Sequence, residues 1–139
     1  MRTQTTATTA TPSEAIEVPI IDLATLDQLN KLPARGGEPL GVRASRLFLK
    51  SAPTLIEQIK RGLSEHTAAD IRMGAHTLKS SSASIGAHEL SITAKELEEK
   101  IRSGQFDDVP TLVSKVESGF QKVQKELERI ISQTIVVAA

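Results

Sequence analysis

A histidine and a lysine one helical turn apart, His76 and Lys79, are the residues whose types and spacing could carry out chemistry. A neutral imidazole is a nucleophile at physiological pH, and its attack on phosphorus gives a phosphoramidate that can react onward. A lysine ammonium three residues further along a helix lies beside the ring and can stabilise charge on a transferring group. The chemistry available to this pair is therefore reversible transfer of a group to and from the ring.

The chain around His76 has the apolar spacing of a helix with one buried side. Five residues of the stretch 70–87 recur at steps of four and three, which places them on one face of a helix in a bundle: Ile71, Ala75, Leu78, Ser82 and Ile85. His76 lies off this stripe, so we expect its ring to point outward. Its neighbours on the outward face are small residues, two cations and one methionine: Ala69, Arg72, Met73, Lys79, Ser80 and Ala83. Such a surface leaves room for another protein's active site to reach the ring.

A lone exposed histidine on a helix is more often only a solvated side chain, and a lone lysine is more often a solvated charge. His66 and His88 fall near predicted helix ends, where solvent or capping roles are expected. The three histidines lack the i, i+4 spacing of a helical metal site, so no metal site is predicted. A basic strip on an earlier helix is expected to be a solvated face: Arg43, Arg46 and Lys50.

Composition bounds the protein class. The 139 residues are enough for one domain with one core, and 17 basic residues balance 17 acidic residues, so no global charge favours nucleic acid or an anionic membrane. The chain has no cysteine, which excludes disulfides and thiolate metal sites and fits a reducing compartment. Three phenylalanines and no tyrosine or tryptophan leave little surface for stacking bases. We therefore expect an aliphatic core and no nucleic-acid partner.

The helices that must position His76 follow from caps and apolar spacing. Thr67 with Asp70 three residues later predicts a capping box at the start of the central helix, and Gly86 predicts a left-handed cap at its end. A core helix is expected over about 40–63, kinked rather than split by Pro53. A third helix is predicted around 90–101, with a stop at Ser103-Gly104 and with its charged residues, Glu98 included, on a solvated surface.

The two ends of the chain complete the predicted architecture. Residues 1–19 are rich in threonine and alanine and predict a flexible linker, and Asp22 caps a short helix that carries Leu23, Leu26 and Leu29 on one side and ends near Pro33. A last helix opens at Asp107-Asp108. Residues 133–139 lack helix signals and are interpreted as a C-terminal tail. No stretch is apolar for long enough to span a membrane. The fold class is thus all-α, an antiparallel four-helix bundle over 20–132 with a short additional N-terminal helix.

The segment from Ala75-His76-Thr77-Leu78-Lys79 through the small-residue run to Gly86-Ala87 resembles the histidine-containing phosphotransfer (HPt) domains of bacterial multi-step phosphorelays. The likeness continues through Leu97-Glu98-Glu99 and the Ser103-Gly104-Gln105-Phe106 turn. One departure is Ser80, where many members have a glycine that gives clearance to an incoming receiver.

The resemblance implies a four-helix bundle in which His76 accepts a phosphoryl group from a receiver-domain aspartyl phosphate and passes it to another receiver. Lys79 matches the family's neighbouring cation. The expected docking residues are those that surround the ring: Ala69, Arg72, Met73, Ser80 and Ala83. The chain would need no cofactor of its own, since a divalent metal would belong to the partner receiver. We expect a cytoplasmic monomer without direct membrane contact, either free-standing or the cytoplasmic end of a hybrid sensor histidine kinase.

Two other functions stay open on the sequence. A helical scaffold that binds a partner without phosphorylation is the first, and acid-labile phosphate on His76 would distinguish it. The histidine-bearing dimerisation domain of a sensor kinase is the second, but Thr77 stands where such domains typically have an acidic residue. No glycine-rich phosphate loop accompanies the isolated pair Gly36-Gly37, so no ATP site is predicted. Whether the chain is part of an enzyme is left undecided.

Overall fold

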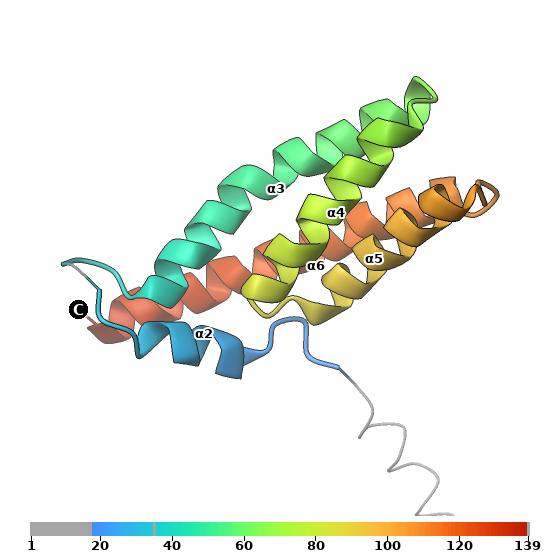
Figure 1. Cartoon of the computed structure of the whole chain (residues 1–139). Helices are drawn as coiled ribbons and strands as arrows, with labels where there is room; N and C mark the ends of the chain where they lie inside the picture. The colour runs from blue at the N-terminus through green and yellow to red at the C-terminus, as the bar shows by residue number, and fades with distance from the viewer. Residues whose placement is uncertain (1–17, 35, 139) are drawn as a thin grey trace, which may run out of the picture.

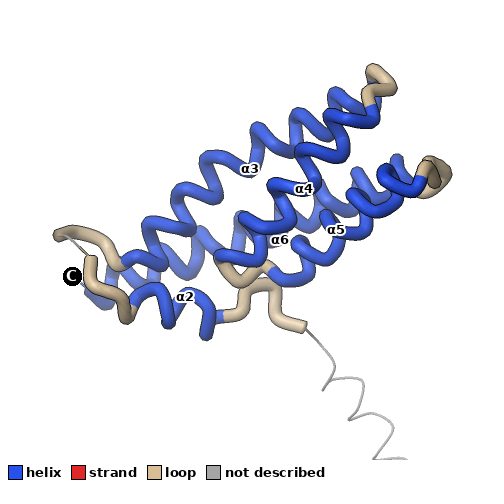
Figure 2. The backbone as a smooth tube through the Cα atoms, viewed as in Figure 1, coloured by secondary structure: helices blue, strands red, loops and turns tan. Residues whose placement is uncertain are grey.

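The computed structural model describes residues 18–34 and 36–138, with side chains through Thr134. This part of the chain contains helices and loops but no strand (Figures 1 and 2). The helices are α2 (Leu23–Asn30), α3 (Leu40–Ser64), α4 (Ala68–Ser84), α5 (His88–Ser103) and α6 (Val109–Ala138). Most of the predicted linker, residues 1–17, lies outside the described residues.

The four long helices form an antiparallel bundle, and α2 lies across one of its ends (Figure 1). Successive helices pack side by side, α3 on α4, α4 on α5 and α5 on α6, and α6 also packs on α3, which closes the bundle. The connections between these four helices are three to five residues long, as expected for antiparallel neighbours. The predicted fold class is confirmed.

The core of the bundle is aliphatic, with a single aromatic pair. The predicted α4 stripe is confirmed, since all five of its members are buried: Ile71, Ala75, Leu78, Ser82 and Ile85. Phe48 of α3 and Phe120 of α6 meet with ring centroids 6.0 Å apart. Gly74 lets α3 approach α4 closely, because a Cβ atom at this position would lie 2.7 Å from Ile59 Cγ1. The small residues of α4 thus bring their neighbours close to the helix axis.

Three helices end in the same hydrogen-bonded turn. At the ends of α3, α4 and α5 an amide donates to the carbonyl five residues earlier: Thr67 N to Gly62 O at 2.8 Å, Ala87 N to Ser82 O at 2.9 Å, and Gln105 N to Lys100 O at 2.9 Å. This closure needs a left-handed residue just before the donor. Gly86 and Gly104, both expected from the sequence as helix stops, fill that place at φ 86° and 77°. At the end of α3 the place is filled by His66, at φ 55°.

The start of α4 differs from the prediction. Thr67 is the N-cap residue, but its hydroxyl makes no bond to an α4 amide and instead lies 3.4 Å from Glu65 O. Asp70, the other half of the predicted capping box, accepts a long hydrogen bond of 3.5 Å from Gln58 Nε2 of α3. The capping box is therefore wrong, because the acidic side chain turns toward the neighbouring helix. By contrast Asp22 caps α2 as predicted, accepting from Ala24 N at 3.1 Å.

Three further expectations are refined by the structure. The short helix α2 ends at Asn30, ahead of Pro33, and Leu23 at its start is 51 % exposed while Leu26 is buried. Helix α3 is not split at Pro53, and its core residues stay buried on both sides of the proline, as Ala52 and Ile56 show. Helix α6 continues through Ala138, so residues 133–138 extend the last helix. No glycine or proline directly precedes them to end the helix, so α6 continues.

His66 provides a test of the turn at the end of α3. A residue with a side chain pays roughly 1–2 kcal/mol for the left-handed conformation, whereas glycine adopts it freely. We expect His66→Gly to raise the midpoint of thermal unfolding by a few degrees, measured by circular dichroism. His66→Ala, which removes the imidazole but keeps the Cβ atom, is the control and should bring no such gain. A lower midpoint for the glycine variant would show that the imidazole stabilises the turn.

Candidate functional site

His76 projects from the outward side of α4, and its side chain is 63 % exposed. One ring nitrogen is nevertheless hydrogen-bonded, since Nδ1 lies 2.7 Å from Oε2 of Glu98 on α5. The other oxygen of the same carboxylate, Oε1, accepts a hydrogen bond of 2.8 Å from Nζ of Lys79. The structure thus brings together the two residues predicted from the sequence and adds a third from the neighbouring helix.

Glu98 is the residue that the sequence interpretation misplaced. The sequence predicts Glu98 on the solvated surface of its helix, but it is buried, with 4 % of the residue exposed. The signal was its position, four residues after Ala94 and three before Ile101, which puts it on the same side of α5 as these buried residues. An ionised carboxylate is tolerated there only because both oxygens have charged or hydrogen-bonding partners.

The partners of Glu98 also determine its charge. Burial raises the pKa of the Glu98 carboxyl, but the hydrogen bonds and charges of Lys79 and His76 outweigh that effect and lower the pKa to about 2. The carboxyl group is therefore ionised at neutral pH and can only accept hydrogen bonds. In the neutral imidazole the proton must then sit on Nδ1, which leaves the lone pair on Nε2. A nucleophilic nitrogen is presented on the exposed side of the ring.

Two further contacts connect α5 to the site. The guanidinium of Arg102, one turn after Glu98, lies 3.4 Å from Oε2 of that carboxylate and is 61 % exposed. Ser91 Oγ donates a hydrogen bond of 2.7 Å to the carbonyl of Lys79, which joins the two helices beside the site. The Ser91 contact depends on the rotation of α5 against α4, which the sequence does not indicate. The Glu98–Arg102 pair has the i, i+4 spacing that a helix brings together, a local signal that the sequence does contain.

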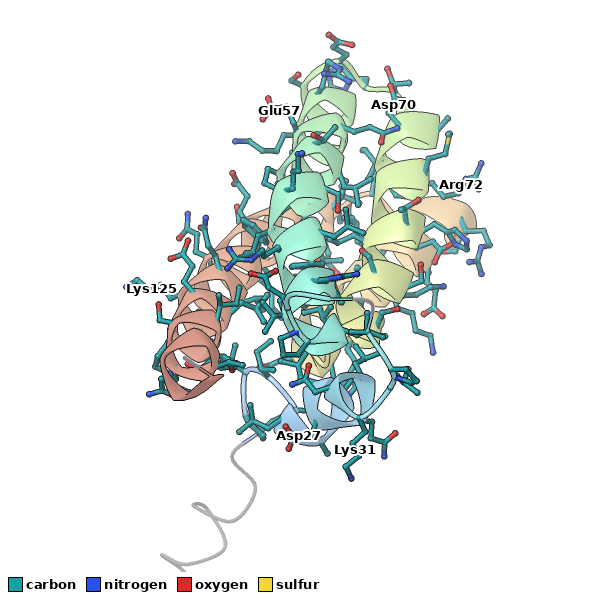
Figure 3. All side chains as sticks on the ribbon, turned by 90° about the vertical axis from the view of Figure 1, so that its left-hand side faces the viewer. Asp27, Lys31, Glu57, Asp70, Arg72 and Lys125 are labelled. Carbon is teal, nitrogen blue, oxygen red and sulfur yellow. The ribbon has the colours of Figure 1, made fainter. Side chains whose placement is uncertain are left out.

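The predicted docking residues all lie at the surface. The five residues expected around the ring are exposed: Ala69, Arg72, Met73, Ser80 and Ala83. Met73 is 53 % exposed, and Arg72 points away from the bundle (Figure 3). Ser80 Oγ donates to Thr77 O at 3.2 Å, so this hydroxyl turns back onto its own helix. His76 is therefore bordered by short or outward-pointing side chains.

The other two histidines lie outside the site. His66 terminates α3, and His88 Nε2 lies 3.2 Å from Asp22 Oδ2, which joins the start of α5 to the start of α2. The hydrogen bond to His88 lowers the pKa of Asp22, although both side chains are about half exposed. In the described residues no group of three His, Asp or Glu side chains could hold a metal ion. Nor does any described helix have the length and apolar character needed to cross a membrane.

Comparison with known proteins gives the family. The family model of the Hpt domain matches residues 43–133, about two-thirds of the chain. The chain belongs to the Hpt domain family. The match covers most of α3 and all of α4 and α5, and it ends within α6. The predicted family is confirmed, and with it the role of the Hpt domain as a phosphotransfer intermediate of a phosphorelay that works with response-regulator receivers.

Two solved structures share the fold of this Hpt domain. Histidine-containing phosphotransfer protein B (HptB) from Pseudomonas aeruginosa PAO1 superposes with a TM-score of 0.76, at 24 % sequence identity over 84 % of this chain and 98 % of that one. A rice protein proposed to be a histidine-containing phosphotransfer protein gives a TM-score of 0.70, at 22 % identity over 91 % and 93 % of the two chains. A search of curated proteins gave no significant match. At 24 % and 22 % sequence identity, these two structural similarities show a shared fold.

The buried carboxylate predicts a specific response to acid. The pKa of Glu98 is about 2 in the folded domain against an ordinary value of 4.5, so the folded state binds fewer protons than the unfolded state between these values. Its contribution to stability is present above about pH 4.5 and is lost as the pH falls toward 2. We expect wild type to lose on the order of 3 kcal/mol more than Glu98→Gln over this window, by urea unfolding at a series of pH values. Parallel pH profiles for the two proteins would contradict the assignment.

Proposed function

We propose that His76 is the phospho-acceptor of this Hpt domain and that it reacts through Nε2. The observation that supports the proposal is the hydrogen bond between Nδ1 and the Glu98 carboxylate, at 2.7 Å. An acceptor on one side of the ring selects the tautomer that exposes a lone pair on the other side. The exposed ring and its short neighbours then allow an active site on another protein to approach Nε2.

The transfer step is a displacement at phosphorus. The Nε2 lone pair forms the N–P bond while the O–P bond of the receiver's aspartyl phosphate breaks, and that electron pair returns to the aspartate as carboxylate. Positive charge develops on the ring, which keeps its proton on Nδ1, and the Glu98 carboxylate stabilises this charge at hydrogen-bond distance. The reverse displacement by the aspartate of a second receiver returns the ring to its starting state, so no proton has to leave Nδ1.

Lys79 and Arg102 provide the positive charge of the site. Both lie against Glu98 in the free domain, Lys79 at 2.8 Å and Arg102 at 3.4 Å. A phosphoryl group on Nε2 adds negative charge close to these cations and gives them a second partner. We therefore assign Lys79 the supporting role expected from the sequence, and Lys79 takes this role while paired with Glu98. We assign the same role to Arg102, which also pairs with Glu98.

The partners that fit this surface are receiver domains of response regulators. The docking face is formed by the exposed residues of α4 around the ring: Ala69, Arg72, Met73, Ser80 and Ala83. A divalent metal that assists transfer is assigned to the receiver. We further propose that the domain acts as a monomer in the cytoplasm. The scaffold and kinase-type dimerisation alternatives have no structural observation in their favour.

The test of the acceptor is direct. His76→Gln should abolish labelling by a phosphorylated receiver, because this face of α4 carries no other histidine whose ring is hydrogen-bonded to a carboxylate. The helical circular dichroism of the variant should stay unchanged. His66→Gln and His88→Gln are matched controls and should label as wild type does. Acid-labile phosphate that persists in His76→Gln but disappears in either control variant would refute the assignment.

A second experiment tests the docking face. Ser80 is exposed one turn from His76, so Ser80→Phe should shift the thermal midpoint by no more than a few degrees. The larger ring should obstruct an approaching receiver and strongly reduce the transfer rate, measured by transfer of labelled phosphate. Glu57→Phe on the exposed side of α3, away from this face, is the control and should transfer normally. Normal transfer by the Ser80 variant would place the receiver elsewhere.

A further inference from the structure

His76 projects from the surface that α4 shares with α5. These helices lie side by side (Figure 1), with α3 as the other main neighbour of α4 and α6 as that of α5. Gly74, two residues before His76, packs against α3, since a Cβ atom there would lie 2.7 Å from Ile59 Cγ1. Two residues turn a helix by about 200°, so His76 points almost directly away from α3. Because its Nδ1 also bonds Glu98 of α5, Nε2 faces out of the α4–α5 surface.

The same relation places Ile92 of α5 on this surface. Leu90, two residues before Ile92, packs against α6, where its Cδ1 atom would lie 3.3 Å from a Cβ atom at Gly119. Ile92 is turned by about 200° from Leu90 and so points almost directly away from α6. The residue is 64 % exposed. A single exposed apolar side chain is common at a protein surface, and Ile92 matters because it shares a face with His76.

Ile92 lies close enough to His76 for one partner to cover both. Glu98 meets His76, and Ile92 is six residues before Glu98, about 9 Å along the axis of α5. Neighbouring helix axes are about 8–10 Å apart, so about 13 Å separates Ile92 from His76. A standard interface covers roughly 800 Å² on each protein, which is a disc of about 16 Å radius. A receiver centred on Nε2 would therefore reach Ile92.

Basic side chains surround the ring on this surface. Lys95 is exposed, and it lies between Ser91 and Glu98, which both contact α4, so it is on the α4 side of α5. The surface as a whole carries four basic and two acidic side chains: Arg72, Lys79, Lys95 and Arg102, with Glu98 and Glu99. Since the whole chain is neutral, this positive excess is local. It complements the negative charge of an aspartyl phosphate and of the carboxylates that hold a receiver's metal.

We propose that the receiver docks across the seam between α4 and α5, with Ile92 as an apolar anchor and with Lys95 and Arg102 as a basic rim. The proposal rests on the proposed function, in which a receiver acts at Nε2 of His76. It adds a second helix to a docking face that the sequence predicted on α4 alone. The receiver surface that fits has an apolar patch about 13 Å from its aspartyl phosphate, the separation of Ile92 from His76.

Ile92→Glu tests the anchor by transfer kinetics, with the receiver that labels wild type. The receiver concentration that gives half the maximal transfer rate should rise about tenfold, because a charge replaces an apolar contact. The maximal rate should stay that of wild type, since Ile92 is too far from the ring to act on the transfer step. The thermal midpoint should shift by no more than a few degrees, because the side chain is exposed.

Leu47→Glu is the matched control. Leu47 is 66 % exposed on α3. It lies about three turns before Gln58, whose side chain reaches Asp70 of α4, so it borders the opposite side of α4 from α5. This variant introduces the same charge at the same exposure and should keep the wild-type half-saturating concentration.

A binding map that needs no transfer separates this proposal from the assignment of the acceptor. The ¹⁵N amide shifts of His76→Gln are followed by NMR while the same receiver is added. We expect the largest changes in α4 and in residues 92–102 of α5, with α3 little affected. Adding Lys95→Glu should weaken the binding, and more strongly at low salt than at high salt.

Three results would overturn the docking proposal. The first is an unchanged half-saturating concentration for Ile92→Glu, and the second is an equal rise for Leu47→Glu. The third is a shift map that covers α3 and α4 without α5, which would place the receiver on the other side of α4. Failure of the acceptor assignment looks different, since labelling would then persist in His76→Gln while the shift map still covered α4 and α5.

Discussion

The Glu98 carboxylate is the group on which the site depends. It is an ionised side chain almost without contact to solvent, and it persists because Nδ1 of His76 and Nζ of Lys79 lie 2.7 and 2.8 Å from its two oxygens. Removing either partner would leave a buried charge only partly compensated, which is costly. The same hydrogen bond decides which nitrogen of His76 is nucleophilic. Stability and chemistry are therefore coupled through one side chain of α5.

The bundle holds α5 and α4 in the register that this interaction needs. Small residues such as Ala75 and Ala94 are fully buried and permit close approach, and the hydroxyl of Ser91 joins α5 to the backbone of Lys79. The turn between the two helices is fixed by Gly86, whose carbonyl accepts from Asp22 N of the segment before α2. A Cβ atom at Gly86 would lie 2.7 Å from Asp22 O, so α2 and the α4–α5 turn fit together only with glycine at this position. The additional N-terminal helix thus helps to fix the turn that follows the helix bearing His76.

Much of this arrangement could be predicted from the sequence, because helix periodicity reports which side of a helix is buried. The α4 stripe, the outward His76, the Asp22 cap and the stops at Gly86 and Gly104 all followed from local spacing. Glu98 did not, since a charged residue on a buried stripe acquires meaning only when its partners on another helix are known. For the same reason the capping box at Thr67 failed: Asp70 turns to Gln58 on α3, a contact absent from any local pattern. Residues 133–138 continue α6 although their composition gives no helix signal.

The central claim is that Glu98 fixes the tautomer of His76 and so exposes Nε2 as the nucleophile. The ¹⁵N chemical shifts of the His76 ring, measured by NMR at a pH where the imidazole is neutral, report the tautomer directly. The structure predicts a protonated, pyrrole-type Nδ1 and an unprotonated, pyridine-type Nε2. A ring with its proton on Nε2 would contradict the account, because the nitrogen that faces the receiver would then have no lone pair to offer.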